Sequence, residues 1–436
     1  MIALQGMKVF PQSDHKTDHE ELKHLSLQKG RSAFIISGNY RLRGELQHDY
    51  NIKTYGTEDD EIFLLSRLRF CMEYRYSSWL KVFAEIQDAR IFGSSFSDED
   101  FQGKNNPYHD PFDINKLYVS LRPFDSLELI IGRQSLGLAG RRVFGPGDWG
   151  NTGRYIWDVA NLIYSNPYFK TQVLFGYNIL HEPDKFPNLD KEGTYALAFY
   201  NTIRKLPFHL ELFYVYKYDQ TGHYSSETGQ AGNLYENYLG GRIKKSFGNW
   251  NILGLGAYQF GSISGDPVSA FGTVFQVDYT LNTIWHPCFI ATYIFGSGDH
   301  DPDDGKQQTF DGIFSGSDTD LYSWMNFAFW KNIHLIQAAM VLKISPKISV
   351  RSEYHAYFLN QEKDAWYFPG KAMRRDTAGL SGSFVGQEVD LTCQANIFNW
   401  FQVLGGYCFF LPGEFAKNTG EHPEAQWAFA QLTFNF

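Results

Sequence analysis

The stretch Ile62–Tyr76, IFLLSRLRFCMEYRY, decides the fold class because its side chains alternate in character. The even positions are mostly apolar or aromatic. The odd positions beyond Leu65 are mostly polar: Arg67, Arg69, Cys71, Glu73 and Arg75. Successive side chains of a strand point to opposite faces, so the pattern predicts a strand with one apolar and one polar face. A soluble sandwich would show the same alternation, so this stretch predicts β structure but not yet a membrane barrel.

Similar stretches recur along the whole chain and predict eighteen strands. They lie at 32–48, 62–76, 79–92, 112–122, 127–134, 156–164, 169–179, 194–204, 208–217, 234–246, 250–262, 268–280, 287–296, 333–345, 348–359, 386–397, 400–410 and 426–436. Short turns such as Ser77-Ser78 alternate with mostly long, polar loops such as 297–332. Short turns on one rim and long loops on the other are typical of an outer-membrane β-barrel. Leu321–Trp330 could be a nineteenth strand, but it would reverse the alternation, so we assign it to a loop.

The last segment, QWAFAQLTFNF at Gln426–Phe436, supports this fold. From Ala428 onward its even positions are apolar and would face lipid, and the chain ends on Phe436. An aromatic C-terminal residue on such a strand resembles the signal read by the bacterial barrel-assembly machinery. The alternative is an ordinary final strand of a soluble β protein. We therefore expect the assembly machinery, outer-membrane lipid and lipopolysaccharide as partners.

The composition agrees with an all-β, up-and-down transmembrane barrel. Aromatic residues make up 17% of the chain, and the aromatic belts at the two water–lipid borders would use them. No apolar run reaches the roughly 18 residues of a membrane-spanning helix. The net charge of −9 argues against a nucleic-acid binder. The four cysteines are far apart and have no metal-site spacing, so we expect no disulfide.

Residues 1–31 are expected to form an N-terminal periplasmic segment before a barrel at 32–436. They contain no apolar stretch long enough for a secretion signal. An outer-membrane protein needs such a signal, so either it was removed from this chain or the barrel interpretation is wrong. The expected location is the outer membrane of a Gram-negative bacterium.

Strand parity assigns charged side chains to the interior, and a barrel of eighteen strands leaves an aqueous channel there. The inward acids include Glu211, Asp278, Glu388 and Asp390. The expected basic lining is Arg41, Arg43, Arg67, Arg69, Arg75, Arg122, Arg242, Lys244 and Arg351. A lining that leans basic in an acidic protein suggests transport of anions. The alternative is that these charges pair across strands and only solvate the lumen.

Two details bear on this lining. The cluster Arg41, Arg43, Arg67, Arg69 and Arg75 lies on neighbouring strands, where like charges need partners or ligands to neutralise them. By contrast, Arg133 shares parity with Leu129 and Ile131, which would point it into lipid. Either a bulge shifts the register there or the strand has already left the membrane.

Three stretches carry a family resemblance. The first is GRQSLGLAGRRVFGPGDWGNTGRYIWD at Gly132–Asp158, and the second is FGSGDHDPDDGKQQTFDGIF at Phe295–Phe314. The third is VGQEVDL at Val385–Leu391, followed by GGYCFFLPGEF at Gly405–Phe415 and the closing strand. In this order and spacing they resemble the alginate export family of outer-membrane barrels, from the fifth strand to the end of the chain. The first four strands match in pattern only.

The resemblance implies a monomeric barrel of eighteen strands that passes an anionic polysaccharide through an arginine-lined constriction. Carried over to this sequence, that role would fall on Arg133, Arg142 and Arg154. Arg67, Arg69 and Arg351 would be supporting lining.

No other chemistry is favoured by the sequence. Asp299, Asp301 and Asp303 resemble the start of a calcium loop, but the glycine falls one position late and position twelve is not glutamate. A solvated acidic loop is the favoured interpretation. Catalytic motifs are absent, so we expect neither an enzyme nor a cofactor.

Three functions remain open at this point. The leading hypothesis is a channel for an anionic polysaccharide or oligosaccharide. The alternative is a general anion-preferring diffusion porin for small solutes. A third class is a structural or adhesive barrel whose long loops are the functional part.

Overall fold

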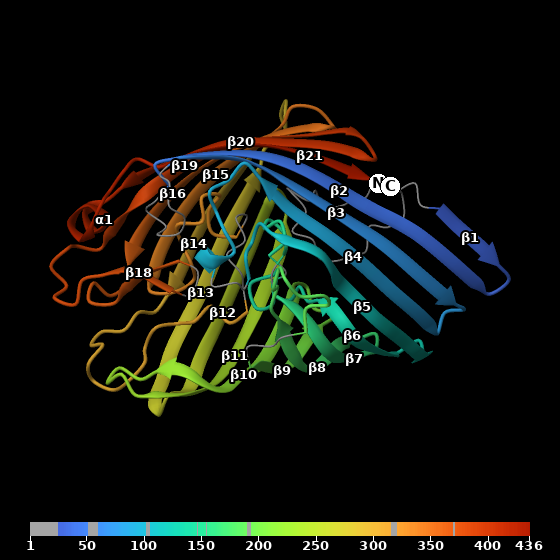
Figure 1. The fold of residues 1–436 in the computed structure, drawn as a ribbon, viewed down its shortest axis with the longest axis horizontal. Helices are drawn as coiled ribbons and strands as arrows, with labels where there is room; N and C mark the ends of the chain where they lie inside the picture. Colours follow the sequence, from blue (N-terminus) through green and yellow to red (C-terminus); the bar gives the residue numbers. More distant parts are fainter. Residues whose placement is uncertain are drawn as a thin grey trace.

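A computed structural model describes residues 25–50, 60–101, 105–145, 147–153, 155–189, 193–314, 321–368 and 371–436. Eighteen antiparallel strands form a closed barrel, because each strand pairs with the next and the last, β21, pairs with the first, β2 (Figure 1). Among the described residues, no helix is long and apolar enough to cross a membrane.

The barrel strands agree with the predicted ones within a few residues at most ends. They are β2 Ser32–His48, β3 Glu61–Tyr76, β4 Leu80–Phe92, β5 Asp110–Phe124, β6 Leu127–Ser135, β7 Ile156–Ser165, β8 Phe169–Ile179, β9 Thr194–Ile203, β10 His209–Ser225, β11 Ala231–Phe247, β12 Trp250–Ile263, β13 Asp266–Thr280, β14 Cys288–Gly296, β15 Ile333–Lys343, β16 Ile348–Leu359, β19 Phe384–Phe398, β20 Phe401–Pro412 and β21 Gln426–Asn435. The fold prediction of eighteen strands is confirmed. β10 and β11 extend furthest beyond their predicted ends, at the rim of the long loops.

Four short elements were not predicted. Strand β1, Leu25–Lys29, forms a hairpin with the start of β2, which Figure 1 shows extending away from the barrel. The other three lie in loops: the 3-10 turn Glu99–Phe101, the hairpin of β17 Ala365–Phe368 with β18 Lys371–Arg375, and the helix α1 Glu414–Thr419. The periplasmic assignment of 1–31 stays a prediction, and residues 1–24 lie outside the described residues.

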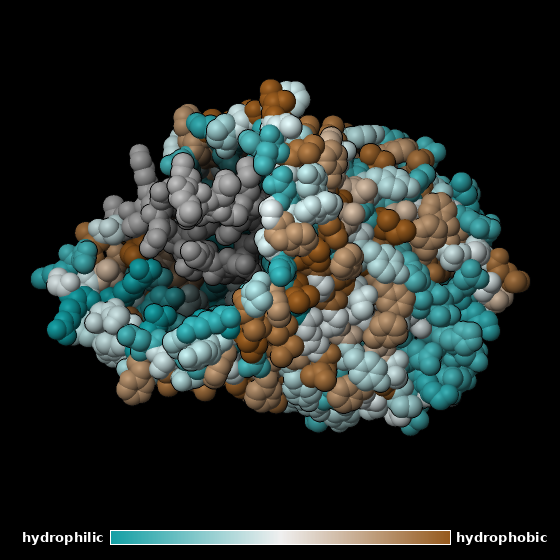
Figure 2. Space-filling view, turned by 180° about the vertical axis from the view of Figure 1, so that it is seen from behind, coloured by the Kyte–Doolittle hydropathy of each residue, from teal (hydrophilic) through white to brown (hydrophobic). Residues whose placement is uncertain are grey.

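The outer face of the barrel is apolar. The side chains that strand parity points outward, such as Ile62, Leu239 and Phe275, are among the most exposed large hydrophobic residues of the chain. Exposed aromatic residues gather at the rim that carries the short turns 77–79, 166–168 and 399–400, for example Trp79, Tyr168 and Trp400. Figure 2 shows brown and pale side chains over the middle of the barrel face and hydrophilic ones toward its end. This distribution fits a lipid-facing band with an aromatic girdle.

The seam between β2 and β21 closes the barrel. The ladder pairs Asn39 with Asn435, and it continues past the end of β21. The Gly38 amide donates to the Phe436 carbonyl oxygen (2.7 Å), and the Phe436 amide donates back to Gly38 (3.0 Å). The final residue of the chain is therefore part of the barrel wall.

Two long loops fold back into the barrel and pack their apolar side chains against the inner wall. We call residues 136–155, between β6 and β7, the first inward loop, and residues 297–332, between β14 and β15, the second inward loop. The described residues of Leu321–Trp330 contain no strand, so the loop assignment of this segment is confirmed. Most of its side chains are buried in the same core as Phe144 and Trp157. Parts of both loops consequently occupy the interior of the barrel.

Candidate constriction inside the barrel

Four arginines form a basic corner on the inner wall of β2 and β3. Arg41 and Arg43 lie on β2, and Arg67 lies directly across the ladder from Arg41. Arg69 follows two residues later on the same face of β3. Arg41, Arg43 and Arg67 are buried, and the Arg69 side chain is 11% exposed. Alternation at period two thus places these arginines inside, as the sequence predicts.

The backbone of the first inward loop contacts this basic corner. Arg41 donates from Nη1 to the Asp148 carbonyl (3.1 Å) and from Nη2 to the Gly150 carbonyl (3.0 Å). Arg67 Nη1 reaches the same two carbonyl oxygens, at 3.3 and 3.5 Å. Asn151 continues the contact, since its Oδ1 accepts from Arg41 Nη2 at 3.2 Å. The hydrogen-bond partners of Arg41 and Arg67 are therefore carbonyl and amide oxygens rather than carboxylates.

Trp149 anchors the middle of this contact. The Arg43 guanidinium lies 4.0 Å from the centre of the Trp149 ring and donates to the Trp149 carbonyl at 2.8 Å. Arg43 is also paired with Glu45, Nε to Oε1, at 2.7 Å. The edge of the Trp149 ring packs on Trp324 of the second inward loop and on Phe429 of the wall. A cation–π contact and aromatic packing together fix this loop residue between two walls.

Asp148 adds a carboxylate to the basic corner. Its side chain is 45% exposed, and its Oδ1 lies 3.5 Å from Arg69 Nη1. Burial alone would raise the pKa of Asp148, but Arg69, Lys116 and Arg67 together lower it below its usual range. Asp148 therefore stays ionised at ordinary pH and faces the arginines as an anion.

Arg133 is buried although its parity predicts a position facing lipid. The ladder of β6 with β7 runs through it without a shift, but Gly132 has a φ of +121°, which turns the chain. Arg133 is buried and binds Asp158 with two bonds of 3.0 and 3.1 Å. It also donates to the Asn188 carbonyl at 2.6 Å. Of the two explanations offered from the sequence, a shift of the β6–β7 ladder does not apply, and an exit of the strand from the membrane stays a prediction.

The remaining predicted basic residues lie apart from the corner. Arg142 is buried between the two inward loops, donates to the Leu321 carbonyl at 2.8 Å and faces the Tyr322 ring. Arg242 pairs with Glu211 (3.2 Å), and Arg351 pairs with Glu353 (2.6 Å). Three others stay near the short-turn rim: Arg75 with Glu73, Arg122 with Glu128, and the half-buried Lys244. Arg154 lies outside the described residues.

The wall of β16 and β19 is acidic, and the second inward loop rests on it. Trp324 Nε1 donates to Glu353 Oε2 at 2.7 Å, and the Met325 amide donates to Glu388 Oε1 at 2.9 Å. Parity already places Glu388 and Asp390 inside. Among the described residues, the buried charged side chains include six arginines but fifteen aspartates and glutamates. The buried charges as a whole are therefore mostly acidic, with a local group of arginines at the β2–β3 corner, and a lining that leans basic stays a prediction.

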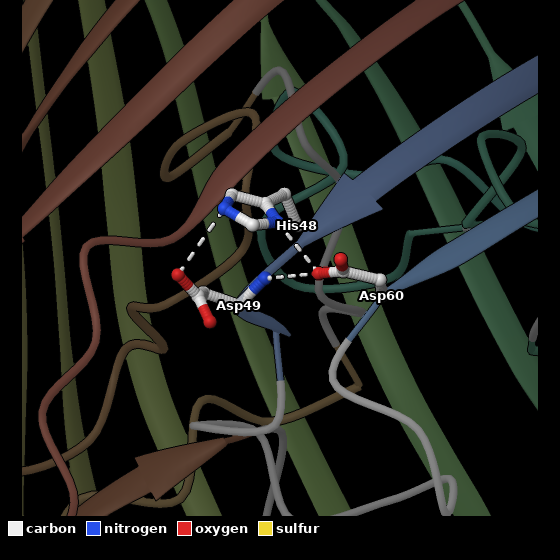
Figure 3. Close-up of side chains that lie close together, drawn as sticks. All are labelled: His48, Asp49 and Asp60. Atoms are coloured by element: carbon white, nitrogen blue, oxygen red, sulfur yellow. Dashed lines mark hydrogen bonds and ion pairs between the residues drawn. The ribbon is translucent and has the colours of Figure 1, made fainter.

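Three groups of described residues bring His and carboxylate donor atoms together. At the long-loop end of β2, the His48 ring lies between Asp49 and Asp60, and both ring nitrogens face a carboxylate, at 3.3 and 2.6 Å (Figure 3). In the second group, His181 Nδ1 is 2.6 Å from Asp110, and Asn188 hydrogen-bonds to both Asp110 and Asp113. The third is Glu353, His355 and Asp390.

The predicted calcium candidates are not among these groups. Asp299 accepts the backbone amides of Asp301 and Gln308, both at 3.1 Å, and so shapes the turn in which it lies. Asp301 and Asp303 are exposed. In the described part of the chain these three carboxylates do not gather around one point.

The family model described as "Alginate export" matches residues 33–428, nearly the whole chain. The chain belongs to the alginate export family. No curated protein matches the sequence. Membership of this family and the closed barrel make the protein an outer-membrane transport channel.

Solved structures share the fold of this alginate export family member at low identity. OpdQ of Pseudomonas aeruginosa has a TM-score of 0.60 at 11% identity, covering 92% of this chain and 97% of that chain. OccK1 (OpdK) of the same organism has a TM-score of 0.58 at 11% identity, covering 92% and 98%. OccAB4 of Acinetobacter baumannii has 0.58 at 9% identity, again covering 92% and 98%. These likenesses bear on the fold alone.

Proposed function

We propose that the channel passes an anionic polysaccharide or oligosaccharide and that the β2–β3 corner is where the polymer's charge is recognised. The observation that carries this is a local excess of positive charge. Arg41, Arg43, Arg67, Arg69 and Lys116 face the carboxylates of Glu45, Glu85 and Asp148, which is five cations against three anions. Membership of a family described by alginate export supports an anionic sugar polymer as the cargo.

The present hydrogen-bond partners of Arg41 and Arg67 are ones that a bound ligand could replace. Arg41 and Arg67 donate to carbonyl oxygens, and Arg41 also to an amide oxygen, so no buried carboxylate has to be displaced from them. A carboxylate of a uronate sugar offers stronger, charge-assisted bonds of the same geometry to a guanidinium. The polymer would replace the first inward loop on these arginines, and Arg69, which is partly exposed, would meet it first.

The test measures ion selectivity and block in planar bilayers. With a salt gradient we expect a reversal potential that shows preference for chloride over potassium, since charges in a narrow passage are incompletely screened at a Debye length of about 10 Å in 0.1 M salt. The double variant Arg67→Glu and Arg69→Glu should weaken or reverse that preference. Replacing the exposed loop residue Asp303 by Asn is the control and should change it little.

Oligouronates identify the cargo class in the same bilayers. Soluble oligouronates should block the chloride current at concentrations at which neutral oligosaccharides of equal length do not. Cation preference in the unmodified protein would refute the charged corner as the selectivity element. Anion preference without block by oligouronates would refute the polymer channel and favour a diffusion porin for small anions.

A further inference from the structure

The acidic wall beneath the second inward loop holds a cluster that the transport proposal does not use. Glu353 and His355 lie on β16, and Asp390 and Glu388 lie on β19. The ladder pairs Glu353 with Asp390 and His355 with Glu388, so the four side chains form two adjacent rows on the inner face. All four are buried; Glu353, the most exposed, is 5% exposed.

The hydrogen bonds in this cluster are incomplete at two of the four residues. Glu353 accepts from Arg351, Gln337 and Trp324, and Glu388 accepts from Met325 and Tyr357. By contrast, neither ring nitrogen of His355 has an aligned hydrogen-bond partner among the described residues, and the Asp390 carboxylate has only the poorly aligned contacts of the Cys408 thiol, the Trp324 backbone and Glu388. Buried polar atoms without partners are rare in folded proteins and call for an explanation such as a bound ion.

The unpartnered atoms converge without pointing at one another. His355 Nε2 lies 3.1 Å from Asp390 Oδ2, yet the two are not aligned as a hydrogen bond. His355 Nε2 lies 4.0 Å from Glu353 Oε1, and the three donor atoms are all within 4.8 Å of one another. Donors about 2.1 Å from a tetrahedral metal ion lie about 3.4 Å apart, so these separations bracket the spacing around a shared cation.

The charge of the cluster calls for a cation as well. Among the described residues of the cluster, Arg351 pairs with Glu353, whereas the other two carboxylates, Asp390 and Glu388, lie next to His355. When the carboxylates are ionised and His355 is neutral, two negative charges remain uncompensated, which is the charge that one divalent ion supplies. Arg351 and Gln337 would then serve as outer partners that orient the Glu353 carboxylate.

We propose that His355, Asp390 and Glu353 form a binding site for one divalent transition-metal cation of the zinc class. A nitrogen donor with carboxylate oxygens suits zinc and its first-row neighbours, whereas calcium and magnesium favour all-oxygen sites. Trp324 and Met325 rest on Glu353 and Glu388, so the cation stabilises the surface on which the second inward loop is docked. This site stands independently of the polymer and its corner on β2 and β3.

The test uses the full chain refolded in detergent, either with a chelator or with Zn²⁺, because the second inward loop covers the site. Metal content after desalting should approach one equivalent per chain. Refolding with Co²⁺ should give the visible absorption bands of a low-symmetry protein site. His355→Gln and Asp390→Asn should each weaken binding by at least about tenfold. His334→Gln on the neighbouring strand β15 is the matched control and should bind as the unmodified protein does.

Folding of every variant is checked without metal, by the gel shift between unboiled and boiled protein. Zn²⁺ should also raise the temperature at which the unboiled band is lost, and only in chains that keep His355 and Asp390. Absence of stoichiometric metal in the folded, unmodified protein would overturn the proposal. Binding that persists in folded His355→Gln and disappears in His48→Gln would also overturn it, since the ion would then belong to the rim group of Figure 3.

Discussion

The ring of Phe436, the last residue, lies against Gly38 in the first barrel strand, in space that only a glycine leaves free. A Cβ atom at position 38 would overlap the Phe436 ring and would lie 2.8 Å from the Arg69 carbonyl oxygen. The same two residues exchange backbone hydrogen bonds across the seam. The closing pair of the barrel therefore depends on a missing side chain as much as on an aromatic one.

The first prediction concerns this seam. Gly38→Val should reduce the fraction of protein that shows the unboiled, faster-migrating band, because the side chain pushes Phe436 and the β3 backbone away. Gly44→Val is the matched control on the same strand, since a Cβ there meets nothing within 4 Å. Deleting Phe436 should impair membrane insertion as well. Equal folded yields for the two glycine variants would show that the seam tolerates the overlap.

The second prediction concerns the turn of the chain at Gly132. A Cβ at this position would overlap the Leu117 carbonyl oxygen, and a φ of +121° is strained for any other residue. Gly132→Ala should therefore cost at least about 1–3 kcal/mol and lower the temperature at which the folded band is lost. Gly256→Ala on β12 is the control, because its nearest neighbour is a methyl group at 4.0 Å. Similar melting of both variants would contradict the strain.

The third prediction concerns the anchoring of the first inward loop. Replacing Arg41 and Arg67 by Met removes the donors to the Asp148 and Gly150 carbonyls, each bond worth about 1.5–3 kcal/mol. We expect larger single-channel conductance and protease cleavage within residues 136–155. Arg122→Met, at an exposed pair near the short-turn rim, should change neither quantity. Unchanged conductance in the folded double variant would mean that the loop is held by its aromatic contacts alone.

The fourth prediction concerns pH. Burial and the neighbouring Asp299 raise the pKa of Glu227, in the β10–β11 loop, to about 7. Because the pKa of Glu227 is raised, its contact with Asp299 stabilises the fold fully below about pH 4.5. This stabilisation is lost as the pH rises through about 7, when both carboxylates are ionised. Glu227 also accepts the Gly305 amide, so hydrogen exchange in 298–308, corrected for intrinsic rates, should be faster at pH 8.5 than at pH 5.

Two variants separate this effect from general loosening of the loops. Glu227→Gln stays neutral and should abolish the pH dependence of exchange. Asp303→Asn, at an exposed position in the same loop, should leave it in place. Exchange that accelerates equally in Glu227→Gln would assign the effect to another group.

The strands were predictable because lipid imposes a strict rule on them. In Ile62–Tyr76 every second side chain faces hydrocarbon, and a shift of one residue would place charges there, so the pattern and the register are fixed together. The alternation of short turns and long loops then gave the number of strands and assigned Leu321–Trp330 to a loop. The seam followed from the even number of strands and the apolar closing segment.

The interior was less predictable, for physical reasons. The partners of Arg41 and Arg67 are backbone carbonyls, which every residue has, so no sequence pattern announces them. Arg133 is buried because Asp158 and the Asn188 carbonyl of a long loop bind it, and parity along a strand cannot predict which loop covers a side chain. The apolar composition of Leu321–Trp330 indicates burial, yet the direction in which a long loop folds depends on the far wall, where Glu353 and Glu388 receive it.

The two inward loops are joined to each other as well as to the walls. Phe144 and Phe314 form a bridge, the Phe314 amide donates to the Val143 carbonyl at 3.1 Å, and Arg142 reaches the Leu321 carbonyl. Neither loop can leave the barrel without breaking this joint or carrying the other with it. The two loops therefore form one joined unit inside the barrel, held on a basic wall at one side and on an acidic wall at the other, so a movement of the first loop at its arginines is transmitted to the second.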